Sequence, residues 1–553
     1  MANRVKFIIA IFFLIYAGIL ARLYYLQILK NNYYLARAQL QYENTVFEKG
    51  LRGSIYFRDK NNDLILVATN KNFPIIYAVP SEIEDVSETI FHLKEFINFS
   101  SQKLENLKKF LSNKKSQYAL ILRKAPEEVV SKIKELNISG IYINNLPERY
   151  YPFNNLASHV LGYVGEDEND IGESGKYGIE KKYDDKLKGE SGKIQDNKIF
   201  NSKSGEDIIL TIDPNIQREA ERILSSLVVN QKAKSGLVIV EEPKTGKILA
   251  MGAVPNFDPN NYSKYDISNF LNPAISKVYE PGSIFKVITM ATGIDAKKFT
   301  PDTEVFDSGS LVLNGKKIQN WDKKAHGKVT MTQVIENSIN VGAAKAQMKI
   351  GREIFLNYLK KFGFNELTGI DLPGEVKGSL KPLLDPKAPD INYATASFGQ
   401  GVSVTPIGLI TSIGAIANGG NLMRPYLNAE NEPQVIARVI STSTAEAVTK
   451  MMVSAVDKAK VAKIKGYSIA GKTGTAQVPD LKRGGYKESY IHTYVGFGPA
   501  SDAKFIILIK IDEPQGAQLA GLTVVPAFRE LAQFILNYYN IPPDRIENDI
   551  IEN

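Results

Sequence analysis

The stretch "EPGSIFKVITM", residues 280–290, places Lys286 inside an apolar run, one helical turn after Ser283. A helix that is apolar on every side is usually buried. A buried lysine is costly unless other groups compensate for its lost hydration. Because burial lowers the pKa of a lysine, as a second nearby cation also does, we expect a neutral amine at Lys286. Such an amine can accept the proton of the Ser283 hydroxyl and activate it as a nucleophile.

The spacing of the two residues fits this interpretation. At positions i and i+3 of a helix, Ser283 and Lys286 share one face, with Cβ atoms ~5–6 Å apart. Pro281 and Gly282 precede the serine and predict that the helix begins there. The helix N-terminus would favour negative charge that develops near Ser283. No histidine accompanies a G-x-S-x-G motif, which disfavours a Ser-His-Asp triad.

The S-x-x-K pattern by itself is a weak signal. It also begins at Ser100, Ser112, Ser131 and Ser501, all in polar stretches that indicate solvated surface. Ser283 differs from these because its helix is apolar and because two further motifs follow it in a fixed order.

The first of these motifs is "ENSINVG", which contains Ser338 and Asn340. A hydroxyl at Ser338 can relay protons between a base and a leaving group, and the Asn340 amide can hold a substrate carbonyl. Ser and Asn are common in loops, so the motif alone is weak.

The second motif is "AGKTGTA", on an expected strand. Lys472 and the threonines Thr473 and Thr475 can bind a carboxylate. Gly474 would let a substrate backbone lie close beside the strand. A backbone N–H near Thr475, with that of Ser283, would form an oxyanion hole. A second K-T-G, at residues 244–246, lies in a predicted hairpin turn and receives a structural interpretation.

Composition excludes several classes of function. A chain of 553 residues predicts two to four domains. The net charge of +8 comes without a dense Lys/Arg block, which disfavours nucleic-acid binding. The absence of cysteine excludes disulfides, iron–sulfur sites and a lipoprotein anchor. With only 4 histidines and no H-E-x-x-H motif, we expect no metal site and no cofactor.

The N-terminus predicts a membrane anchor. A short basic segment, residues 1–6, precedes fifteen residues without a charge, Phe7–Ala21. These span roughly 22 Å, short of the ~30 Å hydrocarbon core, but Lys6 and Arg22 can snorkel and the apolar pattern continues. Without a small-x-small cleavage site, an uncleaved signal anchor at residues 7–29 is favoured over a cleaved signal peptide. The basic flank places the N-terminus in the cytoplasm and the rest outside the membrane.

Two larger regions follow the anchor. Residues 30–204 predict an elongated mixed module with short amphipathic helices over 82–136, a strand and turn near 139–152, and a polar surface connection at 175–193. Residues 205–541 predict one α+β domain. The expected order is a strand and a helix capped near Asp213, a hairpin, the apolar helix, three antiparallel strands and a closing amphipathic helix. The polar tail, residues 542–553, is expected to fray.

S-x-x-K, S-x-N and K-T-G in this order resemble the penicillin-recognising serine enzymes. Over nearly its whole length the chain resembles a class B penicillin-binding protein. The matching pieces are "LARLYYLQI", "RGSIYF", "ERYYP", "SHVLGYVG", "YGIEKKYDDKLKGESG", "LTIDPNIQ", "PKTGKILAM", "YEPGSIFK", "SINVG", "FGQGVSVTP" and "AGKTGTAQ". One departure is Phe57 in "RGSIYFRDKNND", where the family usually has Asp, and it concerns the pedestal rather than the chemistry.

The resemblance implies a membrane helix, a non-catalytic dimerisation-like pedestal and a penicillin-binding/β-lactamase-like transpeptidase domain. The helix would lie in the inner membrane, and the catalytic domain would lie in the periplasm. It implies a peptidoglycan D,D-transpeptidase that joins stem peptides through a serine acyl-enzyme and is acylated by β-lactams. It assigns catalysis to Ser283 as nucleophile, Lys286 as base and Ser338 as proton relay. The residues it assigns to substrate binding are Asn340, Lys472, Thr473, Gly474 and Thr475.

Within the family, "YEPGSIFK", the Asn of "SIN" and "FGQGVSVTP" resemble the division (FtsI) type, and the elongation type is the alternative. No glycosyltransferase motif precedes Gly205, so the resemblance implies a partner membrane glycosyltransferase of the FtsW/RodA kind and other division proteins. A β-lactamase or D,D-carboxypeptidase shares the three motifs but passes the acyl group to water. A division scaffold with a vestigial pocket is the non-catalytic alternative.

Overall fold

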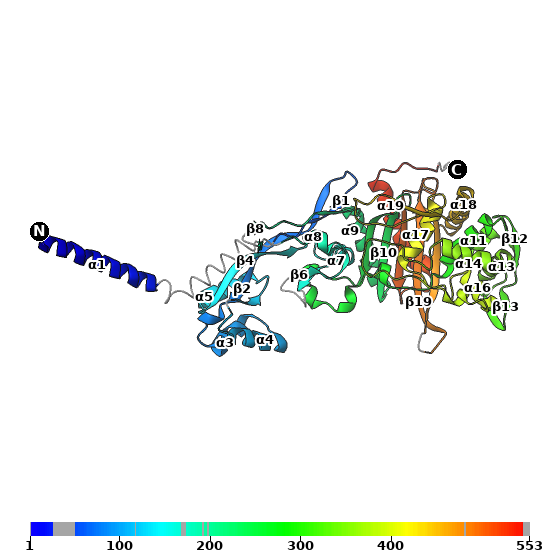
Figure 1. The fold of residues 1–553 in the computed structure, drawn as a ribbon. Helices are drawn as coiled ribbons and strands as arrows, with labels where there is room; N and C mark the ends of the chain where they lie inside the picture. The colour runs from blue at the N-terminus through cyan, green and yellow to red at the C-terminus, as the bar shows by residue number, and fades with distance from the viewer. Residues whose placement is uncertain are drawn as a thin grey trace, which may run out of the picture. The chain divides into compact units, whose positions relative to one another are not determined.

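The computed structural model of the chain describes residues 2–25, 50–116, 118–166, 173–190, 193–195, 198–480 and 483–545. They divide into two compact units, each drawn in Figure 1 and each treated by itself below. Unit 1 comprises Met1–Ser54, Ala68–Tyr150 and Asp185–Asp207, and unit 2 comprises Ile55–Val67, Tyr151–Asp184 and Ile208–Asn553.

The first unit contains the N-terminal helix α1 (Ala2–Tyr24). Within the part of the chain that the structure describes, no helix combines the length and the apolar character needed to cross a membrane. The predicted anchor, residues 7–29, extends beyond the described residues at 26–29, and Met1 of the predicted cytoplasmic tail also lies outside them.

The rest of the first unit packs short helices on antiparallel strands. β2 (Leu64–Ala78) pairs with β3 (Ala119–Leu122) and β4 (Ile141–Tyr150). The expected amphipathic helices over 82–136 are confirmed, with β3 between the second and the third. They are α3 (Val86–Phe96), α4 (Ser101–Ser112) and α5 (Glu127–Leu136). Their apolar faces share one buried cluster with Ile76 and Ile121 of the strands. A small hairpin, β7 (Lys193–Gln195) with β8 (Lys198–Phe200), follows.

The prediction of a polar surface connection at residues 175–193 is wrong. The segment contains two short helices, α7 (Gly178–Lys182) and α8 (Asp184–Leu187). Ile179 and Leu187 are fully buried, and Glu180 is buried with its carboxylate accepting a hydrogen bond from the Tyr151 hydroxyl at 3.1 Å. Ile179, Tyr183 and Leu187 recur every four residues, a helical spacing that the surrounding charges obscure in the sequence.

The second unit is built on a five-stranded antiparallel sheet in the order β11-β10-β20-β19-β18. The strands are β10 (Ser235–Glu242), β11 (Lys247–Val254), β18 (Ala470–Pro479), β19 (Tyr486–Gly498) and β20 (Phe505–Asp512). The expected hairpin and the expected pairing of the three C-terminal strands are confirmed. Because β18 has no further strand beside it in the described sheet, its outer backbone edge is free to pair with an extended peptide.

Helices cover this sheet, as the sequence predicts for an α+β domain. On one face, α9 (Pro214–Asn230) and α19 (Ala520–Tyr538) share a buried cluster with Val238, Val240 and Ile507. Asp213 caps α9 by accepting from two backbone N–H groups, as expected. Residues that alternate with this cluster along the strands point to the opposite face. Lys472, Gly474 and Lys510 belong to that face, where register pairs Gly474 with Thr493 and Thr493 with Lys510.

Further helices and paired strands of the second unit lie between β11 and β18 in sequence, and several gather beside the sheet in Figure 1. The helices are α10 (Pro273–Ser276), α11 (Phe285–Asp295), α12 (Met331–Glu336), α13 (Asn340–Ile350), α14 (Arg352–Lys361), α15 (Lys381–Leu384), α16 (Asp390–Ala396), α17 (Pro406–Ala417) and α18 (Thr442–Ala459). The antiparallel strand pairs are β12 (Glu304–Asp307) with β15 (Gly327–Thr330), β13 (Ser310–Leu313) with β14 (Lys316–Gln319), and β16 (Asn421–Met423) with β17 (Val435–Arg438).

Three further short elements of this unit precede α9: α6 (Ser158–Leu161) and the hairpin of β5 (Val164–Glu166) with β6 (Glu173–Gly175). In addition β1 (Ile55–Arg58) pairs in parallel with β9 (Ile208–Leu210). Phe57, the departure from the family pattern, lies in β1 and is completely buried opposite Leu210, where an unpaired aspartate would be costly.

The expectation that the tail frays is wrong at its start. The Asp544 carboxylate accepts from the Ser468 backbone N–H at 2.7 Å and from the Ser501 hydroxyl at 2.8 Å. Arg545 donates to Asp457 at 2.7 and 2.9 Å. These polar side chains therefore tie the beginning of the tail to the domain, while residues 546–553 lie outside the described part of the chain.

Candidate active site

Ser283 lies at the entrance to α11. It is the middle residue of a single 3-10 turn, Gly282–Ile284, that continues directly into the helix. Gly282 has φ +58°, a left-handed conformation that glycine adopts at little cost. The expected helix start is therefore confirmed, and the Ser283 side chain stays partly accessible while both of its neighbours in the turn are buried.

Lys286 lies one turn further along and is 0% exposed. Its amine is surrounded by four oxygens: Ser283 Oγ at 2.8 Å, the Ser338 backbone oxygen at 2.7 Å, Ser338 Oγ at 3.1 Å and Asn340 Oδ1 at 2.8 Å. The structure thus brings the first two motifs into direct contact around one buried nitrogen.

The chemistry of these four oxygens defines what the amine can do. The Ser338 carbonyl and Asn340 Oδ1 can only accept hydrogen bonds. A neutral amine has two N–H groups, and these two acceptors occupy both. Its lone pair is then left facing the two hydroxyls, Ser283 Oγ and Ser338 Oγ, either of which can donate to it. The neutral form of Lys286 is therefore satisfied and is placed to receive the Ser283 proton.

Electrostatics favours this neutral form. Burial, and then the charge of Lys472, lower the pKa of Lys286 well below its ordinary value. Lys472 is 4% exposed, and burial lowers its pKa to about 8. Its amine donates to Ser338 Oγ at 3.0 Å. Ser338 Oγ therefore lies between a neutral amine on one side and a charged amine on the other at pH 7.

Ser338 has an unusual backbone conformation, and the side-chain amide of Asn340 has a defined orientation. Ser338 has φ +55°, which is costly for a residue with a side chain and typical of functional sites. Asn340 donates from Nδ2 to the Gln319 backbone oxygen at 2.9 Å. Because a carbonyl cannot donate, this contact fixes Oδ1 toward Lys286.

The third motif lies on β18 beside residues 281–284, the turn that carries the expected nucleophile Ser283 and that we call the nucleophilic turn. Thr473 and Thr475 are partly exposed and alternate with the buried Lys472 and Gly474. A Cβ at Gly474 would lie 2.8 Å from the Pro281 backbone oxygen, so close packing against the turn also requires glycine there. This is a constraint of the fold, and it adds to the predicted role of Gly474 in substrate approach. No hydrogen bond joins either threonine hydroxyl to Ser283 among the described residues.

Three consecutive residues that the sequence analysis does not single out, 319–321, hold the second motif. Besides the Gln319 contact with Asn340, Trp321 Nε1 donates to the Asn337 backbone oxygen at 3.2 Å. The chain has a single tryptophan, and it lies in this stretch between the first two motifs, which is the one signal that could have drawn attention to it.

Asn320, the middle residue of this stretch, is buried and also contacts the second motif. Its Oδ1 accepts from the Val341 backbone N–H at 3.1 Å, in the first turn of α13, whose own N-cap residue offers no side-chain acceptor. Its Nδ2 donates to the buried Asp307 at 2.7 Å, and His326 Nδ1 lies 2.6 Å from the same carboxylate oxygen. We call Gln319, Asn320 and Trp321 the 319–321 bracket.

The turn before Ser283 is held by the "FGQGVSVTP" segment. Tyr279 and Val404 exchange backbone hydrogen bonds at 3.0 and 2.9 Å, and Glu280 Oε1 accepts from the Gly401 backbone N–H at 3.0 Å. A Cβ at Gly399, where φ is +82°, would lie 2.3 Å from the Gly282 backbone oxygen. The segment that carries the family resemblance therefore packs directly against the nucleophilic turn.

The repeated motif fragments elsewhere have structural roles. Ser100 is the N-cap of α4, accepting from the Lys103 backbone N–H. The second K-T-G lies in the β10–β11 turn as predicted, with Lys244 paired to Asp502 and Gly246 at φ +84°. Within the described residues, no group of three or more His, Cys, Asp or Glu side chains is placed to hold a metal ion.

The 319–321 bracket predicts a local effect of Asn320→Ala. The substitution removes the acceptor of the Val341 N–H and a donor to the buried Asp307, a loss on the order of 2 kcal/mol. Amide hydrogen exchange over residues 338–344 should become at least tenfold faster, as measured by mass spectrometry. The matched control is Lys317→Ala, an exposed position in β14, which should leave this exchange unchanged. Equal exchange in both variants would contradict a positioning role for Asn320.

Comparison with known proteins agrees with this geometry. The family model of the penicillin binding protein transpeptidase domain matches residues 236–533, and that of the penicillin-binding protein dimerisation domain matches residues 47–207. The first match contains every predicted site residue and covers more than half of the chain.

Curated relatives are similar over most of their length. The chain is 31% identical to stage V sporulation protein D of Bacillus subtilis (strain 168), over 98% of this chain and 86% of that protein. It is 30% identical to a peptidoglycan D,D-transpeptidase FtsI homolog of Mesostigma viride, over 97% and 96% respectively. It is also 30% identical to peptidoglycan D,D-transpeptidase FtsI of Escherichia coli (strain K12), over 85% and 81%. With both domains matched in order, the chain belongs to the class B penicillin-binding proteins, among which it resembles the FtsI type.

Proposed function

We propose that this protein is a serine-type peptidoglycan D,D-transpeptidase that cross-links stem peptides through an acyl-enzyme on Ser283. The observation that carries the proposal is the buried Lys286 amine, 2.8 Å from Ser283 Oγ, with its two N–H groups taken by acceptors and its lone pair facing hydroxyls. The substrate class is supported by the names of relatives, which include peptidoglycan D,D-transpeptidase FtsI.

Acylation begins with attack of Ser283 Oγ on the carbonyl carbon of the penultimate D-Ala of a donor stem peptide. As the C–O bond forms, the hydroxyl proton passes to the neutral Lys286 amine. The C–N bond to the last D-Ala then breaks. The leaving nitrogen takes a proton through Ser338 Oγ, which lies 3.1 Å from Lys286 Nζ and 3.0 Å from Lys472 Nζ.

Transfer of the acyl group reverses these steps. The amine of a neighbouring stem attacks the ester carbonyl, its surplus proton passes to Lys286 or Ser338, and the C–O bond to Ser283 breaks. An amide cross-link forms and the serine hydroxyl is restored. A β-lactam acylates the same serine, but its ring nitrogen stays tethered after the C–N bond breaks, so the ester persists.

Binding roles follow from the third motif and Asn340. We assign the substrate carboxylate to Lys472, Thr473 and Thr475, since a charged amine and two partly exposed hydroxyls flank the free edge of β18. Asn340 keeps one N–H of Nδ2 beyond its bond to Gln319, and this donor can hold a substrate carbonyl. Gly474 keeps the edge narrow enough for a peptide to lie alongside.

Labelling by a fluorescent penicillin tests the nucleophile. Ser283→Ala should lose all covalent label, because the other hydroxyl beside the buried Lys286 amine, that of Ser338, also accepts from Lys472 and serves as the proton relay. Ser131→Ala, in another S-x-x-K on the exposed side of α5, should label like the wild type. Labelling of Ser283→Ala at the wild-type level would refute the assignment. A label that is lost within seconds from the wild type would favour a β-lactamase, and no labelling of the wild type would favour the vestigial scaffold.

The pKa of Lys472 predicts a pH dependence. The cation that attracts the carboxylate is present below about pH 8 and is lost as the pH rises through that value. The second-order rate constant of acylation by benzylpenicillin should therefore fall about tenfold between pH 7 and pH 10. A fall of this size corresponds to the loss of one charge-assisted hydrogen bond to the carboxylate. The fall cannot come from Lys286, because its amine only becomes more fully neutral, and so a better base, as the pH rises.

The methyl ester of benzylpenicillin is the matched control, since it has no carboxylate and its acylation rate should not fall above pH 8. Lys472→Arg should keep acylation by the acid constant to pH 10, because arginine stays protonated. The same decline for the acid and the ester would contradict the role of Lys472.

We further propose that α1 anchors the chain in the cytoplasmic membrane as a single-pass helix, with residues 1–6 in the cytoplasm, the anchor at 7–29, the pedestal at 30–204 and the catalytic domain at 205–541 in the periplasm. The charge-free run Phe7–Ala21 and its basic N-terminal flank support this topology. We propose a partner glycosyltransferase of the FtsW/RodA kind and a role in septal wall synthesis. Septal rather than lateral localisation of the tagged chain separates this role from elongation.

Because the chain has no cysteine, single introduced cysteines report the topology without background. A membrane-impermeant maleimide that reaches the periplasm of intact cells should label Ser226→Cys, at an exposed position of α9, and should label Asn3→Cys only after lysis. Equal labelling of the two variants in intact cells would contradict the single-pass arrangement.

A further inference from the structure

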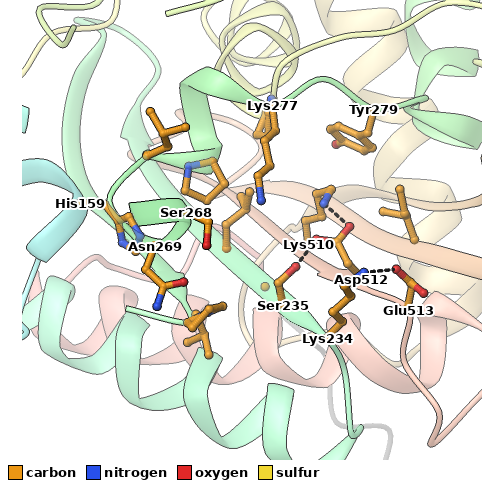
Figure 2. Close-up of a pocket in the computed structure, with 18 of the residues that line it drawn as sticks. His159, Lys234, Ser235, Ser268, Asn269, Lys277, Tyr279, Lys510, Asp512 and Glu513 are labelled. Carbon is orange, nitrogen blue, oxygen red and sulfur yellow. Dashed lines mark hydrogen bonds and ion pairs between the residues drawn. The ribbon is translucent and has the colours of Figure 1, made fainter. Parts of the chain in front are cut away.

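A cavity of about 390 Å³ lies in the second unit on the same sheet face as Lys472 (Figure 2). Its floor comes from the start of β10 and the end of β20, and its walls come from the segment 268–279 that leads to the nucleophilic turn. None of the predicted site residues lines it. The catalytic mechanism leaves this cavity unused.

The cavity contains more positive charge than its carboxylates neutralise. Lys510 is ion-paired with Asp512, and Lys234 Nζ lies 3.1 Å from Glu513. Lys277 is the third lysine of the lining, and no carboxylate pairs with it anywhere in the described chain. Figure 2 shows the Lys277 amine pointing into the cavity, on the side of Lys510. Three cations and two anions leave one positive charge without a partner.

The charge of Lys277 affects the pKa values of its neighbours His159 and Lys510. Burial lowers the pKa of His159 to about 4, against a hydrogen bond with the Asn269 backbone that raises it, and the charge of Lys277 makes the smallest contribution, also downward, so this imidazole is neutral at pH 7. Burial lowers the pKa of Lys510 as well, Asp512 opposes that shift, and Lys277 adds to it. The buried Lys510 and the exposed Lys277 therefore repel one another across the cavity, and an anion between them would replace repulsion with attraction.

Apart from Ser235, Ser268, Asn269 and the Tyr279 hydroxyl, the rest of the lining is apolar. Leu271 and Val278, at the rim, are 47% and 46% exposed, which is high for large apolar side chains at the mouth of a cavity. Pro255, Val478 and Ile491 also line the cavity, and Ile491 is buried. A cavity of a few hundred Å³ that combines apolar walls with converging polar groups is typical of small-molecule sites.

We infer that this cavity is a binding site for a small amphipathic monocarboxylate, with its carboxylate between Lys277 and Lys510 and its apolar body against Leu271 and Val278. One unneutralised charge matches a monoanion. The Ser235 hydroxyl donates to Asp512 at 2.7 Å and so helps to hold the Asp512 carboxylate in place. The apolar rim distinguishes this ligand from a free inorganic anion, which would gain nothing from it.

The site is connected to the nucleophilic turn through Tyr279. The Lys510 amine lies 5.0 Å from the centre of the Tyr279 ring, and the Tyr279 backbone pairs with Val404. Glu280 and Ser283 follow directly in the chain. A ligand carboxylate that pairs with Lys510 would therefore change the contact between the Lys510 amine and the Tyr279 ring. Tyr279 lies only four residues before Ser283.

The probe for this site is 4-(trifluoromethyl)benzoate, observed by fluorine NMR with the full-length protein in lipid nanodiscs. Its line should broaden, and the line of the neutral 4-(trifluoromethyl)benzamide should not. The dissociation constant should rise at least tenfold in Lys277→Gln and in Val278→Glu, which adds a carboxylate at the exposed rim. It should be unchanged in Lys244→Gln, a surface lysine outside the cavity. Equal melting temperatures of the variants exclude misfolding, because both positions are exposed.

Lys472→Gln separates this cavity from the active site, whose lysine also attracts carboxylates. Broadening that persists in Lys472→Gln and disappears in Lys277→Gln assigns the probe to the cavity. The reverse pattern, or no broadening by the wild type, would overturn the inference. Equal binding of the benzamide would refute the need for an anion, and displacement by equimolar inorganic phosphate would refute the role of the apolar rim. The assay requires no catalysis, so its result is independent of the proposed acyl transfer.

Discussion

The amine of Lys286 has lost its water and is surrounded instead by four oxygens from Ser283, Ser338 and Asn340. An ammonium would have to share three N–H groups among these oxygens in a desolvated space beside Lys472. A neutral amine gives its two N–H groups to the two obligate acceptors and turns its lone pair to the hydroxyls. The burial that makes the lysine costly for folding is therefore the same burial that suits it to the proposed role of a base.

This arrangement requires three separate parts of the fold to meet within hydrogen-bond distance. The turn before α11 presents Ser283, and the loop before α13 presents Ser338 in a left-handed conformation. β18 presents Lys472. The parts are held by contacts that leave little room, such as Gly399 against the backbone of Gly282 and Gly474 against that of Pro281. Positions of reacting groups then depend on packing, where a shift of about 1 Å can cost a hundredfold in rate.

Two lysines in the site have lowered pKa values, and they suit different roles. In the proposed mechanism Lys286, fully buried and next to another cation that lowers its pKa, handles protons as a neutral amine. Lys472 keeps a pKa of about 8, remains charged at pH 7 and suits a carboxylate. Ser338 Oγ touches both amines, so it can pass a proton from one side of the site to the other. A similar imbalance of charge, around Lys277, marks the cavity behind Tyr279.

The sequence by itself determined the parts of the site whose chemistry depends on local spacing: Ser283 and Lys286 on one helical turn, the capped helix after Asp213, and the hairpin that explains the second K-T-G. It also indicated which three motifs belong together. Only the tertiary structure decided what depends on contacts between distant residues. Asn320 supports Ser338 and Asn340 across a buried Asp307, Lys510 and Lys277 face one cavity from different segments, and the 175–193 connection hides a helical spacing among charges. No pattern of neighbouring residues encodes such contacts, because they arise only when the sheet and the helices fix the distances between segments.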